Sequence, residues 1–311
     1  MRPRIVITGV AGFIGSNLAD RLLVEGYRVV GVDDLSAGSR SQVPDGVEFH
    51  EHDVRDLARL DLLASGDVVF HLAAKNCISD CQIDPVATAS INVVGTVAVL
   101  DAARRAGARK VIYAESSALY EGTTALPTRE DAFEPRSFYA VSKAAGMLFA
   151  RAFQQCHGLT LTALRYFCVY GPRQDYRRSI PPVMSAFIIH LLRGERPVIY
   201  GSGEKRRDFV HVDDVNAFHL LCVTDPRTDN RTFNIGSGVS YSVNEIYGSI
   251  AGMLGSDIEP EHRADLPGEA QETLADITAA RALGWLPRIG LTDGVQDLAR
   301  YYSRTRIPWT V

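Results

Sequence analysis

The sequence predicts an α/β protein with a doubly wound parallel sheet and a smaller C-terminal substrate-binding lobe. Short apolar runs alternate with longer segments of helical periodicity through the first half of the chain. A glycine-rich turn separates the first apolar run from the first helical segment. After about Pro172 the alternation becomes irregular. We therefore expect a nucleotide-binding domain over residues 1–171, with some later segments returning to it, and a lobe formed mainly by residues 172–311.

The predicted elements follow one another along the chain in a regular order. Strands are expected at residues 5–8, 28–32, 47–51, 67–72, 110–114 and 159–166, and the main helices at residues 13–25, 91–105 and 139–157. The strands are almost wholly apolar, which is typical of strands covered on both faces. Gly26 and Gly107 follow the first two helices, where glycine commonly ends a helix.

Composition excludes several classes of function. The 311 residues carry a formal net charge of −4 and no long basic cluster, so we expect no nucleic-acid partner. The N-terminus lacks the apolar core of a signal peptide, and no apolar stretch long enough to cross a bilayer is expected. The five cysteines are scattered without CxxC spacing. We therefore predict no metal site and a reduced, cytoplasmic compartment.

The segment "ITGVAGFIGSNL" has the glycine pattern of a Rossmann dinucleotide site, between a strand and a helix. Gly9 would permit the tight turn, Gly12 the close approach of a pyrophosphate, and Gly15 the close packing of helix on strand. Phe13 and Ile14 begin the helix, whose free N–H groups would face the phosphates. These five residues form the first part of the predicted cofactor site.

Acidic residues at later strand ends indicate which dinucleotide is bound. Asp33, followed by Asp34, ends the second strand at the distance expected for a ribose ligand. A carboxylate there accepts hydrogen bonds from a ribose diol and repels a 2′-phosphate, which favours NAD over NADP. Asp53 is placed to meet the adenine, although it could instead cap a helix. The other residues assigned to the cofactor site are Val54, Leu72, Ala73 and Ala74.

Tyr139 and Lys143 lie four residues apart on a predicted helix and therefore share one face. A phenol with a pKa near ~10 is a poor base at neutral pH. A neighbouring ammonium and a positively charged nicotinamide would favour the phenolate and lower that pKa. Because Y-x-x-x-K occurs often by chance, the catalytic interpretation depends on the preceding glycine motif and on the strand-end Ser116.

Together these motifs resemble the extended short-chain dehydrogenase/reductase family, in its nucleotide-sugar epimerase/dehydratase branch. The resemblance covers the whole chain and is carried by "TGVAGFIGSNLADRLL", "HLAA", "NVVGTVAVLDAA", "YAVSK", "LRYFCVYGPRQ", "YGSGEKRRDFVHVDDV", "FNIGSG" and "LADITAARALGW". It implies a UDP-sugar cleft between the lobes and an NAD that is recycled in each turnover. It also implies a homodimer formed through helices 91–105 and 139–157.

The resemblance implies a first step in which Tyr139 removes the proton of the sugar 4-hydroxyl as hydride leaves C4. Dehydratases of this branch carry an acid pair where this chain has Ser117 and Ala118, whereas Ser116 keeps the hydroxyl that contacts the sugar. Without a base for C5, the 4-keto sugar would rotate in the site and take the hydride back on its other face, which is C4 epimerisation. Two alternatives remain. Glu115 or Glu121 could restore dehydratase chemistry, or the protein could be a non-catalytic NAD-binding regulator.

The resemblance places two contacts to the nucleotide and sugar in the C-terminal half and puts a third in doubt. Arg207 matches an arginine that binds the nucleotide diphosphate, and Thr273 matches a position that limits the size of the C2 substituent. Leu266 stands where hexose epimerases often have a second phosphate-binding arginine. Ser117 is assigned to the substrate site together with Ser116.

The sugar itself is left open between UDP-glucuronate and a neutral UDP-hexose such as UDP-glucose or UDP-galactose, with a UDP-N-acetylhexosamine third. Cys168 replaces an asparagine that is common in epimerases of neutral and N-acetylated sugars, and a small residue there favours a uronate. Asp175 stands where bacterial glucuronate epimerases usually have arginine. Arg177 and Arg178 follow closely, and either could meet a C6 carboxylate or could be solvated.

Overall fold

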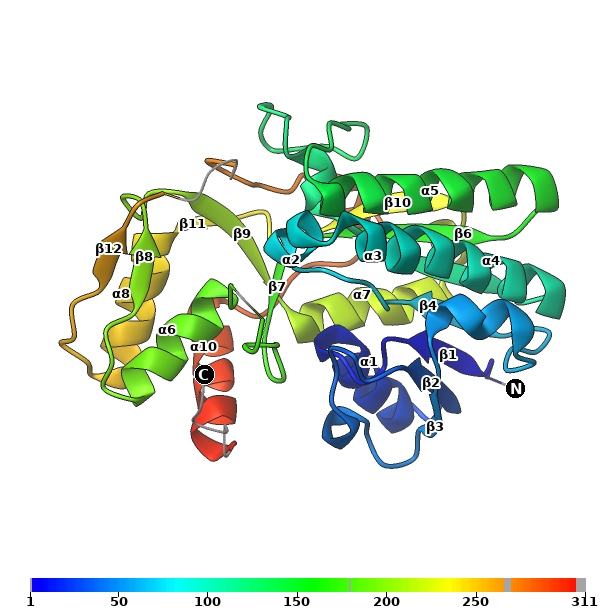
Figure 1. The fold of residues 1–311 in the computed structure, drawn as a ribbon, viewed down its shortest axis with the longest axis horizontal. Helices are drawn as coiled ribbons and strands as arrows, with labels where there is room; N and C mark the ends of the chain where they lie inside the picture. Colours follow the sequence, from blue (N-terminus) through cyan, green and yellow to red (C-terminus); the bar gives the residue numbers. More distant parts are fainter. Residues whose placement is uncertain (1, 179, 266–269, 306–311) are drawn as a thin grey trace.

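A computed structural model describes residues 2–178, 180–265 and 270–305 and divides them into two lobes (Figure 1). The larger lobe holds a seven-stranded sheet flanked by long helices. The smaller lobe holds short strands and three further helices, and the strand β7 (Cys168–Tyr170) runs between the two lobes. The doubly wound α/β prediction is confirmed.

The large sheet is parallel throughout and has the strand order β10-β6-β5-β4-β1-β2-β3. Its strands are β1 (Ile5–Thr8), β2 (Val29–Asp33), β3 (Glu48–Glu51), β4 (Val68–His71), β5 (Lys110–Ser116), β6 (Leu161–Tyr166) and β10 (Arg231–Ile235). Chain order reverses at β1, which pairs with both β2 and β4. In such sheets ligands bind beyond the carboxyl ends of the strands at this reversal.

Helices cover both faces of this sheet (Figure 1). The helices concerned are α1 (Phe13–Val24), α4 (Gly95–Ala106), α5 (Phe138–His157) and α7 (Val212–Thr224). Side chains of α1 and α7 pack on one face in a core with Ile5, Ile7 and Phe70. Side chains of α4 and α5 pack on the other face with Val6 and Tyr113. The alternation of inward residues along β1 and β5 decides which face each side chain meets.

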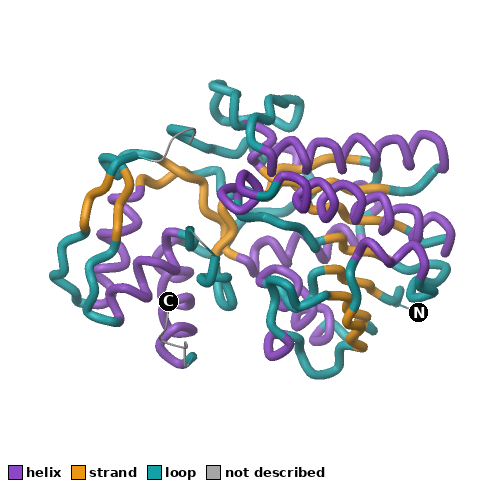
Figure 2. Tube along the Cα trace, in the orientation of Figure 1, coloured by secondary structure: helices purple, strands orange, loops and turns teal. Residues whose placement is uncertain are grey.

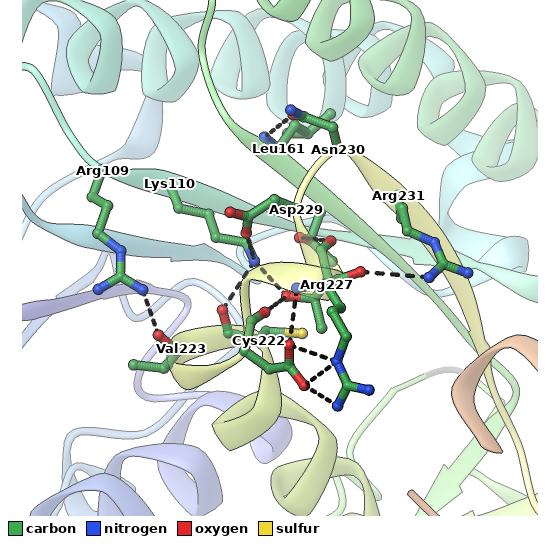
Figure 3. A network of polar contacts seen from close by, with 12 residues as sticks. Arg109, Lys110, Leu161, Cys222, Val223, Arg227, Asp229, Asn230 and Arg231 are labelled. Carbon is green, nitrogen blue, oxygen red and sulfur yellow. Dashed lines mark hydrogen bonds and ion pairs between the residues drawn. The ribbon is translucent and has the colours of Figure 1, made fainter. Parts of the chain in front are cut away.

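Two later segments, α7 and β10, return from the second half of the chain to the large lobe. Figure 3 shows a polar network at the amino end of β5, where Lys110 reaches the end of α7. The Lys110 ammonium is 1% exposed and donates to Cys222 O (3.0 Å), Thr228 Oγ1 (2.6 Å) and Asp229 Oδ1 (2.5 Å). A cation at a helix C-terminus satisfies otherwise unpaired carbonyls. The contact therefore fixes the returning chain to the sheet.

The small lobe combines short strands and helices, as Figure 2 shows by secondary structure. Its buried apolar side chains form a core of their own. One sheet has the order β11-β9-β7 and a second pairs β12 with β8. The strands are β7 (Cys168–Tyr170), β8 (Val198–Tyr200), β9 (Arg206–His211), β11 (Ser240–Ser242) and β12 (Glu261–Arg263), and the helices are α6 (Val183–Leu192), α8 (Val243–Leu254) and α10 (Leu291–Arg304). The remaining short helices are η1 (Arg40–Gln42), η2 (Val54–Arg59), α2 (Ile78–Ile83), α3 (Pro85–Ala89), η3 (Ser90–Val94), η4 (Ser117–Tyr120), η5 (Pro226–Thr228) and α9 (Thr278–Arg281).

The helix predicted at residues 91–105 is longer than expected. It begins at Pro85 and passes through a π-helical turn, Ser90–Val94, before α4. The run Pro85–Ala106 is long and apolar enough to cross a membrane by length and composition, which corrects the expectation that no such stretch exists. Half of its most apolar window is buried inside the protein, and core helices of globular proteins pass the same test.

Candidate active site

The glycine-rich turn follows β1 at the point where strand order reverses. Gly9 has a φ of +77°, a conformation that side chains with a Cβ rarely adopt. A Cβ at Gly15 would collide with the carbonyl oxygen of Gly9, so α1 begins close against the turn. These features agree with the predicted roles, in which Gly9 permits the tight turn and Gly15 permits close packing of the helix on the strand.

The N-terminus of α1 provides a cradle suited to an anionic group. Gly12 is its N-cap and no side chain caps the helix, so the first backbone N–H groups are left for a ligand. Phe13 and Ile14 supply the next N–H groups, and both side chains are half-buried. The first turn contains no acidic residue. The donor set therefore fits the diphosphate of a dinucleotide.

The two acids after β2 have different surroundings. Asp33 is buried, and its carboxylate accepts hydrogen bonds from the N–H groups of Ala11 (3.0 Å) and Leu35 (2.9 Å). Burial raises the pKa of Asp33, and these two hydrogen bonds oppose the rise. Asp34 is exposed, and its Oδ1 accepts from Ser36. Asp33 thus holds the glycine-rich turn to the end of β2, while Asp34 faces outward beside it.

Asp53 caps the short helix η2, which is the alternative that the sequence left open for it. Its Oδ1 accepts from the N–H of Arg55 (2.8 Å), and both carboxylate oxygens accept from the Arg55 guanidinium. Hydrogen bonding to Arg55 holds the pKa of Asp53 below its usual range. Val54 is buried behind it. An adenine contact by Asp53 stays a prediction.

The loop after β4 packs directly on the glycine-rich turn. A Cβ at Gly9 would come within 2.8 Å of the N atom of Ala73. The N–H of Ala73 donates to Thr8 Oγ1 (3.3 Å), and Leu72 and Ala74 are half-buried on either side. The predicted cofactor residues from β1 and from β4 therefore lie next to each other.

The catalytic pair lies at the start of α5. Ser137 caps this helix through its hydroxyl, which accepts from the N–H of Ala140 (3.1 Å). Tyr139 and Lys143 follow on one helical face, and the Tyr139 hydroxyl is hydrogen-bonded to Ser116 at the end of β5. Lys143 is 3% exposed, with its Nζ 4.6 Å from the centre of the Tyr113 ring. The structure thus brings the three predicted catalytic residues together.

Burial dominates the ionisation of this pair. It raises the pKa of Tyr139, while the hydrogen bond to Ser116 and the positive charge of Arg178 oppose that rise. Burial lowers the pKa of Lys143 to about 8, and the charge of Glu115 opposes that fall. The expected lowering of the tyrosine pKa is therefore absent from the protein alone, because desolvation outweighs the neighbouring cations.

Neither glutamate beside the catalytic serine is free to act as a base at C5. Glu115 is fully buried on the face of β5 opposite to that of Ser116, and it pairs with Arg165 of β6 (2.7 Å). Glu121 accepts hydrogen bonds from Ser137 N (2.7 Å) and Ser137 Oγ (2.8 Å). Both carboxylates have structural partners, which favours epimerase over dehydratase chemistry.

The two arginines after β7 point to different places. Arg177 donates to Asp175 Oδ1 (3.1 Å) and to Ala37 O (2.9 Å), so it ties the inter-lobe loop to the segment after β2. The charge of Arg178 acts on Tyr139, and its buried Nε has no hydrogen-bond partner among the described residues. Of the two, Arg178 is therefore the one directed to the catalytic end of the cleft.

The remaining substrate residues lie on the strands between the lobes and at the end of β5. Cys168 begins β7 and is half-buried opposite Phe209 of β9. Arg207 of β9 donates to Arg206 O (2.8 Å), and Thr273 accepts from the N–H of Asp208 (3.4 Å), so both flank β9. Ser117 starts η4, directly after Ser116. Leu266 lies outside the described residues.

Asn92 is a site residue that the sequence reasoning did not single out. It lies in the π-helical turn, and its amide donates to Lys75 O (2.9 Å) and Ser142 Oγ (2.9 Å) while accepting from Lys75 N (2.8 Å). It therefore connects the loop after β4 to the catalytic helix. The available signal was a buried amide inside an apolar helix, since such a group requires partners.

Comparisons with known proteins agree with this geometry. The model of the NAD dependent epimerase/dehydratase family matches residues 5–236. UDP-glucose 4-epimerase of Mycolicibacterium smegmatis is 39% identical, over 96% of this chain and 98% of its own. The UDP-glucose 4-epimerase structure from Thermotoga maritima, determined with UDP-glucose, has a TM-score of 0.93 at 34% identity, over 97% of this chain and 99% of that one. UDP-glucuronic acid 4-epimerase from Bacillus cereus (Y149F mutant), in complex with NAD and a fluorinated UDP-glucuronic acid, has a TM-score of 0.89 at 28% identity, over 97% and 99%. With a family match over most of its length, this chain belongs to the NAD dependent epimerase/dehydratase family.

Proposed function

We propose that this protein is an NAD-dependent UDP-sugar 4-epimerase. The observation that carries the proposal is the Ser116–Tyr139–Lys143 arrangement with Ser117 and Ala118 at the positions where a dehydratase needs acids. The two nearby glutamates are engaged elsewhere. The epimerases that match over almost the whole chain support the same activity.

The residues of the site account for the chemistry at C4. Tyr139 accepts the proton of the sugar 4-hydroxyl as C4 is oxidised, and returns it when C4 is reduced. The Lys143 ammonium, four residues on along the same helical face, would favour the phenolate, and the Ser116 hydroxyl would position the sugar oxygen. NAD would be held by the turn that runs from Gly9 to Gly15, and when bound it would supply the hydride acceptor and donor. Because neither carboxylate next to Ser116, Glu115 or Glu121, is free to act as a base at C5, the 4-keto sugar keeps its C6 substituent and is reduced on either face.

For the sugar, we propose the interconversion of UDP-glucose and UDP-galactose, which fits the UDP-glucose 4-epimerases that match at 39% and 34% identity. Arg207 of β9 would bind the diphosphate. One observation favours UDP-glucuronate as a second candidate. Arg178 lies near Tyr139 with a buried Nε that has no partner among the described residues, and a C6 carboxylate would provide one.

One substrate panel tests both proposals. Purified protein is given UDP-glucose, UDP-galactose, UDP-glucuronate or UDP-N-acetylglucosamine in D₂O and followed by NMR. Interconversion at C4 without deuterium at C5 is expected, and deuterium at C5 or loss of the 6-hydroxyl would overturn the epimerase assignment. Arg178→Met and Arg177→Met form a matched pair for the sugar. A selective loss of UDP-glucuronate turnover in Arg178→Met alone would make the uronate the substrate, whereas unchanged preferences in both favour the neutral hexose.

We also propose a homodimer formed through α4 and α5. The outer surface of α5 exposes Val141, Leu148 and Phe149, and Val94 is exposed just before α4. A group of exposed apolar side chains of this size usually marks an interface. We expect a mass of two chains by light scattering, and a shift towards one chain in Leu148→Arg. A mass of one chain for the unmodified protein would reject the dimer.

A further inference from the structure

On the face of β5 that α5 covers, a charged side chain lies beneath the catalytic helix. Tyr113 and Glu115 are two residues apart and therefore point to the same face, on which α5 packs. The Tyr113 hydroxyl donates to Lys143 O (3.3 Å), and its ring lies under the Lys143 ammonium. Glu115 is the next residue of β5 on this face after Tyr113, and it immediately precedes Ser116.

An arginine of the neighbouring strand holds this carboxylate in place. Arg165 Nε donates to Glu115 Oε2 (2.7 Å), and Arg165 Nη2 contacts Met147 Sδ (3.7 Å), one helical turn after Lys143. Arg165 Nη1 donates to Tyr120 Oη (2.8 Å), so the guanidinium is fixed on several sides. The Glu115–Arg165 pair therefore lies under the turn of α5 that begins at Lys143.

One oxygen of Glu115 is left over by this arrangement. Oε1 is buried and has no hydrogen-bond partner among the described residues. A buried, unpaired carboxylate oxygen is costly unless a nearby positive charge compensates it. Arg165 is committed through its Nε to the other oxygen. The Lys143 ammonium lies over the ring of Tyr113 on the same face, and the charge of Glu115 acts on it.

We propose that Glu115 is a positioning residue for the epimerase reaction, acting as the buried counter-ion that keeps the Lys143 ammonium charged beside Tyr139. The inference rests on the proposed epimerase function. It assigns Glu115 a role through Lys143 and gives it no contact with the sugar. Arg165 then serves to orient the carboxylate.

The other titratable groups around Lys143 cannot replace this charge. His71 of β4 is buried and hydrogen-bonded to Thr8 and Thr96, and burial lowers its pKa to about 3, so it is neutral. Tyr113 is buried, which raises its pKa and keeps its phenol neutral. Tyr139 cannot act as the counter-ion either, because it is the group whose phenolate the Lys143 ammonium favours.

The test compares the pH dependence of kcat/KM in Glu115→Gln, Arg165→Met and Lys110→Met. The pH profile of kcat/KM should fall on its alkaline side where Lys143 loses its charge. Glu115→Gln is expected to move this alkaline limb to lower pH by about one unit. Activity below that limb should be retained. Arg165→Met breaks the same ion pair but keeps the carboxylate, so its limb should stay or move up. Lys110→Met breaks a buried ion pair at the other end of β5 and should leave the limb unchanged.

Thermal unfolding of each variant separates stability from positioning. All three are expected to lower Tm. Glu115→Gln and Arg165→Met each leave a buried charge unpaired, and Lys110→Met leaves buried acceptors at the end of α7 without their donor. An unmoved limb in Glu115→Gln, or an equal downward shift in Arg165→Met, would overturn the proposal. If Glu115→Gln does not fold, the double variant Glu115→Gln/Arg165→Met removes both charges and should still show the lowered limb. Absence of C4 epimerisation in the unmodified protein would instead reject the proposed function.

Discussion

Both carboxylate oxygens of Glu121 accept hydrogen bonds from Ser137, one from its backbone N–H at 2.7 Å and the other from its hydroxyl at 2.8 Å. Ser137 is the N-cap of α5, two residues before Tyr139. The segment after β5, which follows directly on Ser116, is thereby held to the helix that carries the catalytic tyrosine. The mutual position of Ser116 and Tyr139 depends on this contact.

Replacing Glu121 with alanine should therefore impair positioning without changing the reaction. We expect a loss of about 1–3 kcal/mol in stability from the broken charge-assisted hydrogen bonds, with a lower kcat. Urea unfolding and initial rates measure the two effects. Glu134→Ala is the control, since it removes an exposed ion pair with Arg136 in the same loop. Deuterium incorporation at C5 that depended on Glu121 would show that it is the missing dehydratase base.

Tyr139→Phe tests the proton transfer directly. Removing the phenol oxygen should lower kcat by about 10²–10⁴-fold, because a positioned general base contributes that much. The fold should persist, since the ring is kept and the lost bond is a single contact to Ser116. Rates of C4 interconversion are compared with the far-UV circular dichroism of the variant. Full activity in Tyr139→Phe would refute the assignment of the base.

Most strands of the first half could be predicted from the sequence because they are short, apolar and flanked by turn residues, whereas β3 is polar and was predicted from its place between turns. Boundaries differed by one or two residues, as for β2, predicted at 28–32 and observed at Val29–Asp33. The seventh strand, β10, was not predicted. It begins with Arg231 and Thr232, and its place beside β6 depends on a long-range pairing that no local pattern encodes.

Within the site, residue types were predictable but their partners were not. The i, i+4 spacing placed Tyr139 and Lys143 on one face, as helix geometry requires. That Glu115 meets Arg165 follows from the register of β5 against β6, which is set by packing far from either residue. Whether Arg177 or Arg178 reaches the cleft depends on the path of an irregular loop. These are tertiary properties with no short-range signal.

Lys110→Met should destabilise the large lobe. The change removes the ammonium that satisfies the end of α7 and leaves Cys222 O and Thr228 Oγ1 without this donor, at a cost of about 1–3 kcal/mol. Chemical denaturation measures this loss. Arg227→Ala, which breaks the neighbouring surface pair with Asp225, should change stability little (Figure 3). Equal effects of the two variants would show that the buried network does not anchor the returning chain.

Two buried histidines should make the protein sensitive to mild acid. Burial lowers the pKa of His71 and of His219 to about 3, from 6.5 in the unfolded chain. Between these values only the unfolded state binds the proton, so stability is full above about pH 6.5 and is lost as pH falls towards 3. Each histidine contributes a slope of about 1.4 kcal/mol per pH unit in that window. Urea unfolding at pH 7, 6 and 5 should show this slope reduced by one histidine's share in His219→Gln and unchanged in the variant of the exposed His157, His157→Gln. A slope that His219→Gln does not alter would mean that His219 is not held neutral in the folded protein.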